Sequence, residues 1–191
     1  MVEISNLKVY DLKESIIACR NAMRTSLPEY TNEEFEASLE RAKKLAKCPT
    51  SSGECNFLSG IRVSFDLVYP GYISPELQRY HWIDIVTSSS KMHKLGAHIQ
   101  AGSFNKYVDP VIIEKLQEYA IKFIEEPTYE NRMKLLSNTP YGLEQFMRIS
   151  TNYLQLRNIY HQRKYHRLKE DWGAFCKMIE SLPYFEEFIN K

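Results

Sequence analysis

The chain has 191 residues, 43% of them hydrophobic, and a formal net charge of +1 at pH 7. This composition indicates one domain with a real core, and the near-neutral charge disfavours the class of nucleic-acid-binding proteins. No segment approaches the roughly 18 apolar residues that a membrane span requires, and the N-terminus lacks the pattern of a secretory signal. We therefore expect a single domain over residues 1–191 that works in the cytoplasm.

The first half of the chain predicts two strands and two helices. Residues 61–68 give the clearest signal, because apolar side chains alternate there with polar ones as in a half-buried strand. Thr31 and Glu34 have the spacing of a capping box ahead of the second helix. The expected elements are a strand and turn at 2–12, a helix at 12–23, a helix at 33–46, a loop at 49–54 and a strand at 61–68.

The second half is richer in helices. Ser74-Pro75 is typical of a helix start, and Asp109-Pro110 is typical of another. Residues 82–86 are apolar and β-branched apart from one acid, Asp84. The other expected elements are helices at 110–125, 128–136, 153–166 and 170–181, and a short strand at 146–151. This pattern predicts an α+β domain in which helices outnumber strands.

Cysteine, histidine and glycine usage argues against two kinds of site. Neither the cysteines nor the histidines have the spacing of a closed zinc site, so we expect reduced thiols and no metal. Only 7 glycines are present, which disfavours a glycine-rich phosphate loop. The cysteines are Cys19, Cys48, Cys55 and Cys176.

Between Gln145 and Lys169 the chain has no acidic residue. Guanidinium groups suit phosphates, so this segment predicts an anionic ligand. A solvated basic helix face explains the same pattern, and charge alone leaves both interpretations open. The basic side chains of the segment are Arg148, Arg157, Arg163, Lys164, Arg167 and Lys169.

A run of four hydroxyl side chains, at 87–90, precedes Lys91, with Arg79 and His81 upstream. Hydroxyl donors beside a cation can hold a phosphate or a carbonyl oxygen, although serine runs are also common in loops. If the run is extended, Ser89 and Lys91 point to the same face. A helix that begins within the run would change this geometry.

The region around these residues resembles the first signature of the flavin-dependent thymidylate synthases. That family carries Arg-His-Arg, two residues, Ser, four residues, Ser, one residue and Arg-Tyr. At the same spacing this chain has Arg79-Tyr80-His81, Asp84, Ser89 and Lys91-Met92. The family precedes the signature with His-Gln and two apolar residues, and here that stretch is Pro75-Glu76-Leu77-Gln78.

The second family signature, Asn-x-Arg-Ser-Leu-x-Asn-Phe-Leu-x-Leu-Arg, is similar to residues 152–163. Its two asparagines and its final arginine fall at Asn152, Asn158 and Arg163. Residues 183–188 resemble the Pro, aromatic and Phe-Glu-x-Phe with which the family often ends. These matches occur in the same order in this sequence as in the family.

The resemblance covers residues 54–188 and implies the fold of the family, an α+β domain with helices packed on a small, mostly antiparallel sheet. Stretches at 80–93 and 158–164 are also similar to phage and prophage proteins, which look like a divergent branch of the family. A phage-encoded member would work in the cytoplasm of the host cell.

The resemblance also implies roles for individual residues. Arg79, Ser89 and Arg163 stand where the family binds the phosphate and base of deoxyuridylate, which makes them the catalytic candidates. If Arg163 lines a solvent-filled cleft, its removal should weaken nucleotide binding and barely change folding stability. The other candidates for substrate contacts are Glu76, Ser90 and Lys91. The candidates for flavin contacts are Arg79, His81, Asn152 and Asn158.

By resemblance, the chain is an enzyme that methylates a uracil deoxynucleotide with a folate one-carbon unit and reduced FAD, which NADPH regenerates. The family is a homotetramer whose site draws residues from several copies, so we expect a homo-oligomer. Tyr80, His81 and Leu154 depart from the family pattern. An alternative is therefore a non-catalytic member of the fold that binds a nucleotide or a host protein. Nucleic-acid binding through residues 148–169 is the least favoured hypothesis.

Overall fold

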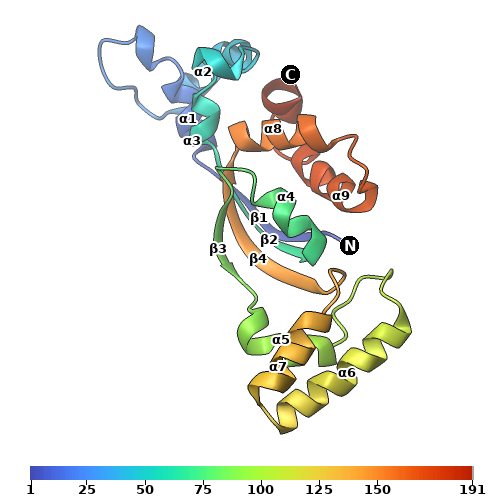
Figure 1. The fold of residues 1–191 in the computed structure, drawn as a ribbon. Coiled ribbons are helices and arrows are strands. Elements are labelled where there is room, and N and C mark those ends of the chain that lie inside the picture. The colour runs from blue at the N-terminus through green and yellow to red at the C-terminus, as the bar shows by residue number, and fades with distance from the viewer. Residues whose placement is uncertain (191) are drawn as a thin grey trace.

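Four strands form one antiparallel sheet, in the order β1-β2-β4-β3, in the computed structural model, which describes residues 1–190 (Figure 1). The structure confirms the α+β class and the small antiparallel sheet. β1 and β3 are the edges, and β2 and β4 are central. The strands are β1 (Glu3–Tyr10), β2 (Arg62–Pro70), β3 (Asp84–Ser88) and β4 (Glu144–Asn152).

The helices gather in groups around the sheet (Figure 1). At one end lie α1 (Leu12–Ala18), α2 (Asn32–Ala46) and α3 (Phe57–Gly60). At the opposite end lie α5 (Lys91–Gln100), α6 (Pro110–Glu125) and α7 (Tyr129–Asn138). To one side of the sheet lie α4 (Ser74–Leu77), α8 (Tyr153–Arg163), α9 (Lys169–Glu180) and a π-helical turn at Phe185–Ile189.

The main core lies on one face of the sheet because β2 and β4 alternate apolar and polar side chains. Phe65 of β2 is buried, and its ring packs against Phe175 of α9 with centroids 5.7 Å apart. The other face is polar, and Arg148 Nη1 lies 3.0 Å from Asp66 Oδ1 there. The alternation over 61–68 therefore predicted both the strand and its buried face.

A second, smaller core holds α5, α6 and α7 together, apart from the main core. It depends on a short set of buried side chains and on partly buried aromatic rings around them. These helices connect to the sheet through β3 on one side and β4 on the other (Figure 1). The buried residues are Leu95, Ile99, Leu116, Ala120, Leu135 and Leu143.

Helix caps confirm several predicted elements, and two predictions need correction. The Thr31 Oγ1 accepts a hydrogen bond from the Glu34 N–H at 3.2 Å, where the sequence predicted the start of α2. The helix expected over 12–23 is too long, because α1 ends at Ala18 and the exposed Met23 continues no apolar face. The sequence interpretation missed α5, which begins directly after the serine run.

No helix within residues 1–190 combines the length and the apolar character needed to cross a bilayer. Among the same residues, no group of His, Cys, Asp and Glu side chains is arranged to hold a metal ion. The four cysteines are free thiols, with Cys55 and Cys176 buried.

We expect Cys176 to resist a thiol reagent in the folded protein. Burial raises the pKa of its thiol from 9.0 to about 11, so little thiolate exists at pH 8. A raised folded-state pKa also means that the stability contributed by the neutral thiol is present below pH 9 and lost as the pH approaches 11. Ellman's reagent followed by peptide mass mapping, with and without urea, checks this. Labelling of Cys176 without urea would contradict it.

Candidate functional site

A cleft of about 580 Å³ lies between the α4–β3 connection and helix α8. The connection supplies the residues at 79–82, and α8 supplies three amide side chains on one helical face. Three residues expected from the sequence therefore come together here. The lining residues are Arg79, Tyr80, His81, Trp82, Gln155, Asn158 and Gln162.

Backbone anchors hold both walls of the cleft. The Thr151 hydroxyl donates to the Trp82 carbonyl at 2.7 Å, which ties the connection to the end of β4. Asn152 is buried and caps α8, and its Oδ1 accepts from the Gln155 N–H at 2.9 Å. Asn152, expected as a flavin contact, thus uses its amide oxygen to start the helix that carries the cleft amides.

Arg163 lies behind Tyr80 and does not line the cleft. Its Nε donates to the Tyr80 hydroxyl at 2.7 Å, and that hydroxyl lies 3.0 Å from Gln162 Oε1. The Arg163 guanidinium also stacks 4.5 Å over the Trp172 ring. From the sequence, we expect the removal of Arg163 to spare stability only if the side chain lines a solvent-filled cleft. This condition is not met, because the side chain is only 12% exposed.

Glu76 neutralises this arginine. Its Oε2 lies 3.0 Å from Arg163 Nη1 and accepts from the Trp172 Nε1–H at 2.6 Å. Its other oxygen lies 3.6 Å from His166 Nε2. The carboxylate and guanidinium therefore satisfy each other beneath the cleft, where a partly buried ion pair also holds α4 against α8 and α9.

The hydroxyl run lies elsewhere in the same chain. At about 3.3 Å per residue, the five steps from Asp84, the first residue of β3, to Ser89 cover about 16 Å. The backbone N–H of Ser89 donates to the Phe146 carbonyl at 2.8 Å, and the Ser89 hydroxyl accepts from the Phe146 N–H at 3.2 Å. These bonds hold the end of β3 that leads into α5 to β4, whereas Asp84, at the other end of β3, pairs with Ser150 close to the start of α8.

Ser90 and Lys91 mark the change from strand to helix. The Ser90 Oγ accepts from the His93 N–H at 3.2 Å and caps α5, whose first residue is the exposed Lys91. Of the two geometries that the sequence left open, the structure therefore has the helix that begins at the end of the run and not an extended segment through Lys91. The physical reason is that a serine followed by residues of helical apolar spacing, at Met92 and Leu95, is an N-cap signal.

The acid-free segment forms no continuous positive surface. Arg148 pairs with Asp66 on the polar face of the sheet, and Arg163 pairs with Glu76. Arg157 is buried and bonds to a backbone carbonyl. Only the later basic side chains of the segment remain exposed, and they are Lys164, Arg167 and Lys169.

Sequence reasoning missed Trp82, Gln155 and Gln162 as cleft residues. Trp82 is 53% exposed, which is unusual for so large an apolar ring, and it offers a face for stacking. The available signal was the spacing of amides at 155, 158 and 162, which repeats with the turn of a helix whose other residues are mostly apolar.

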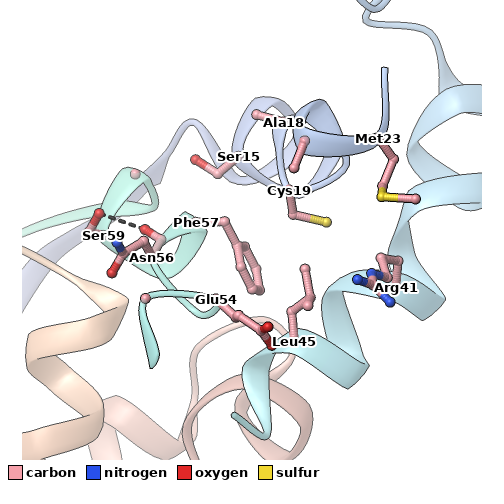
Figure 2. Close-up of a pocket in the computed structure, with 13 residues that line it drawn as sticks. Ser15, Ala18, Cys19, Met23, Arg41, Leu45, Glu54, Asn56, Phe57 and Ser59 are labelled. Carbon is pink, nitrogen blue, oxygen red and sulfur yellow. Dashed lines mark hydrogen bonds between the residues drawn. The ribbon is translucent and has the colours of Figure 1, made fainter. Parts of the chain in front are cut away.

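A second cavity, of about 560 Å³, lies between α1, α2 and α3 (Figure 2). Apolar atoms of Leu45 and Phe57 line it together with the thiol of Cys19, and Arg41 lies at its side. Burial raises the pKa of the Cys19 thiol, which favours the protonated form. None of the residues expected from the sequence to bind a ligand lines this cavity, so the cleft beside α8 is the candidate site.

Comparison with known proteins identifies the fold. No protein-family model matches the sequence, and no curated protein matches it. A flavin-dependent thymidylate synthase ThyX from Helicobacter pylori, complexed with FAD and dUMP, is similar with a TM-score of 0.74 and 16% identity over 99% of this chain and 98% of its own. A second ThyX structure from that organism, also with FAD and dUMP, gives 0.72 and 15% over 99% and 96%. The chain thus has the fold of these enzymes.

Proposed function

We propose that the chain binds a uracil deoxynucleotide and a flavin, and that it acts as a flavin-dependent, thymidylate synthase-like methyltransferase. One observation carries the proposal: Arg79, His81 and Asn158, which were expected from the family signatures, gather at one cleft in a fold similar to ThyX enzymes. Folate and NADPH would be further substrates. The reaction would take place in the cytoplasm, that of the host cell if a phage encodes the chain.

The residues around the cleft fit a flavin ring. The volume of about 580 Å³ falls within the roughly 300–1,000 Å³ common for small-molecule sites. Trp82 offers a stacking face, Asn158 offers amide donors and an acceptor, and Arg79 and His81 offer groups for phosphate. A bound flavin would supply the electrons, while these side chains would orient the reactants and exclude water.

The separation within one chain supports a site completed by a second copy. Arg79 and His81 lie at the cleft, whereas Ser89 and Lys91 lie at the far end of β3. The backbone from Asp84 to Ser89 alone covers about 16 Å, which is a long span for one nucleotide to bridge within a single chain. We therefore propose a homo-oligomer, a tetramer by resemblance, in which Ser89 and Lys91 of one copy approach the cleft of another.

Subunit mixing tests this proposal. We expect Arg79→Ala and Lys91→Ala each to weaken deoxyuridylate binding by about tenfold or more, the range for a lost charge-assisted hydrogen bond. Co-expressed with different tags and purified as mixed oligomers, the two variants should restore wild-type affinity in a fraction of the sites. Calorimetry measures both the affinity and the fraction. Ser88→Ala, an exposed hydroxyl at the end of β3, is the matched control and should bind normally.

The outcomes separate the possible arrangements. Mixed oligomers that never recover wild-type sites would place both groups in one chain or outside the site. A strict monomer by light scattering at micromolar concentration would remove the shared site. Wild-type protein that binds neither deoxyuridylate nor a flavin would overturn the proposed function and leave only the fold.

One observation favours the alternative, a non-catalytic member of the fold. Arg163 is paired with Glu76, and the oxygen of Asn152 caps α8, so two expected ligand contacts already have partners within the chain. The visible spectrum of the purified protein distinguishes the two functions. Flavin absorption, as purified or after reconstitution, supports the enzyme, and a protein that gains none supports the non-catalytic member.

A further inference from the structure

Gln155 is a polar side chain enclosed in the protein without an internal partner for its amide. The residue is 4% exposed, yet it lines the cleft. Its backbone N–H bonds to Asn152, but its side-chain amide makes no hydrogen bond within residues 1–190. Among residues 1–190, the fully buried side-chain nitrogen and oxygen atoms without a partner do not include those of Gln155, so its amide is reached from the cleft. An amide aimed into a cleft and unpaired in the chain is available to a ligand.

The neighbouring amide of Gln162 has a fixed orientation. The Arg163 Nε–H can only donate, so the Tyr80 hydroxyl accepts from it and gives its own proton to Gln162 Oε1. Burial raises the pKa of Tyr80, which keeps that proton in place. With its oxygen occupied, Gln162 presents its NH₂ group as a donor. The Glu76–Arg163 pair thus sets the hydrogen-bonding pattern of the cleft from behind.

The cleft therefore combines a flat apolar ring with amides that can both donate and accept. Gln155, Asn158 and Gln162 lie along one face of α8, and Trp82 faces the same space from the α4–β3 connection. The basic side chains Arg79 and His81 are exposed. A planar, neutral heterocycle with its polar edge toward α8 matches this arrangement, because the ring can stack while the edge is paired.

We propose that Gln155 determines specificity by pairing with the imide edge of a planar ring, O=C–NH–C=O. Its amide oxygen would accept from the imide N–H, and its NH₂ group would donate to the adjacent carbonyl. Two bonds from one amide form a bidentate pair, and an amide held in this orientation favours an imide over cytosine, whose amine and unprotonated ring nitrogen need the amide turned over. The proposal rests on the proposed function and names the feature of the ligand that this cleft recognises.

Two ligands of the proposed function share this edge, the uracil base and the pyrimidine-dione end of a flavin. Cytosine lacks it, since an amine replaces one carbonyl and the ring nitrogen loses its proton. Calorimetry with deoxyuridylate, deoxycytidylate and riboflavin therefore tests the shared chemistry and separates the two sources. Riboflavin carries no phosphate, so its binding does not depend on the cations or on a second copy.

We expect the wild type to prefer deoxyuridylate to deoxycytidylate, and Gln155→Leu to lose about tenfold or more of the affinity for whichever imide ligand binds. Gln155→Glu offers only acceptors and cannot donate to an imide carbonyl, so it should weaken binding of the imide ligand and shift the preference toward deoxycytidylate, whose amine donates to a carboxylate. If the role of Gln155 is purely structural, its substitution should change the melting temperature but not the ratio of the deoxyuridylate and deoxycytidylate affinities. Because the cap of α8 uses the Gln155 backbone, both variants keep it.

The outcomes distinguish the inference from the proposed function. If deoxyuridylate or riboflavin binds, but neither variant changes the affinity or the preference for deoxyuridylate over deoxycytidylate, Gln155 does not contact the ligand. In that case the inference is wrong and the proposed function stands. If only riboflavin binds, in a manner that depends on Gln155, the inference stands and the nucleotide part of the proposed function is wrong. If the wild type binds none of the probes, both are wrong.

Discussion

Arg157→Ala is expected to lower the free energy of unfolding by about 3 kcal/mol. The side chain is 6% exposed; its Nη1 donates to the Ala46 carbonyl at 2.7 Å and its Nη2 to the Cys55 Sγ at 3.2 Å. Ala46 is the last residue of α2, where backbone carbonyls lack helical partners and the helix dipole is negative. The guanidinium therefore closes α2 and ties it to α8.

Urea unfolding followed by circular dichroism measures the effect. Arg157→Lys is the matched control, because it keeps the charge and most of the volume but cannot reach both partners as a fork, and we expect an intermediate loss. No carboxylate within residues 1–190 pairs with Arg157, so added salt should leave the difference between wild type and variant nearly unchanged. Arg157→Ala with wild-type stability would contradict the anchoring role.

Arg163→Ala is expected to cost about 2–3 kcal/mol of stability, because it leaves the Glu76 carboxylate partly buried without its cation. For a chain of this size, that loss lowers the melting temperature by about 5 °C or more. Glu76→Gln should cost less, since an amide still accepts from the Trp172 Nε1–H. Differential scanning calorimetry on both single variants and the double variant gives the coupling between the two residues.

Lys164→Ala is the matched control for this second prediction, because Lys164 is the exposed neighbour of Arg163 and has no carboxylate partner within residues 1–190. A small coupling energy would mean that the ion pair contributes little beyond its separate contacts. An unchanged melting temperature together with a large loss of deoxyuridylate affinity would instead mean that Arg163 releases Glu76 and contacts the ligand directly.

Local patterns in the sequence predicted much of the fold. The alternation over 61–68 identified β2 because each buried side chain alternates with a solvent-facing one, and Thr31 and Asp109 identified helix starts through their caps. The pattern could not identify β3 with the same certainty, because its five residues are all exposed and carry no alternation. α5 was missed because the serine that caps it was interpreted as part of a loop.

The candidate site was harder to predict from the sequence, because its arginines form ion pairs with carboxylates that lie far away along the chain. The segment around Arg148 and Arg163 contains no acid, but Asp66 and Glu76 reach both arginines from earlier parts of the chain. Local composition therefore overstated the free positive charge. Gln155 was missed for a related reason, since only the folded chain shows that this mostly buried residue lines a cleft with its amide.

The two separate cores have a consequence for how such a chain can change over evolutionary time. Helices α5, α6 and α7 depend on their own small set of buried side chains and not on the packing between the sheet and α8 and α9. Substitutions at these buried positions therefore fall outside the cleft beside α8, whereas Lys106 and Tyr107, between α5 and α6, bond to Glu170 of α9. The buried packing of α5, α6 and α7 can therefore change while the amide-lined cleft is retained, so the two parts of the fold can diverge at different rates.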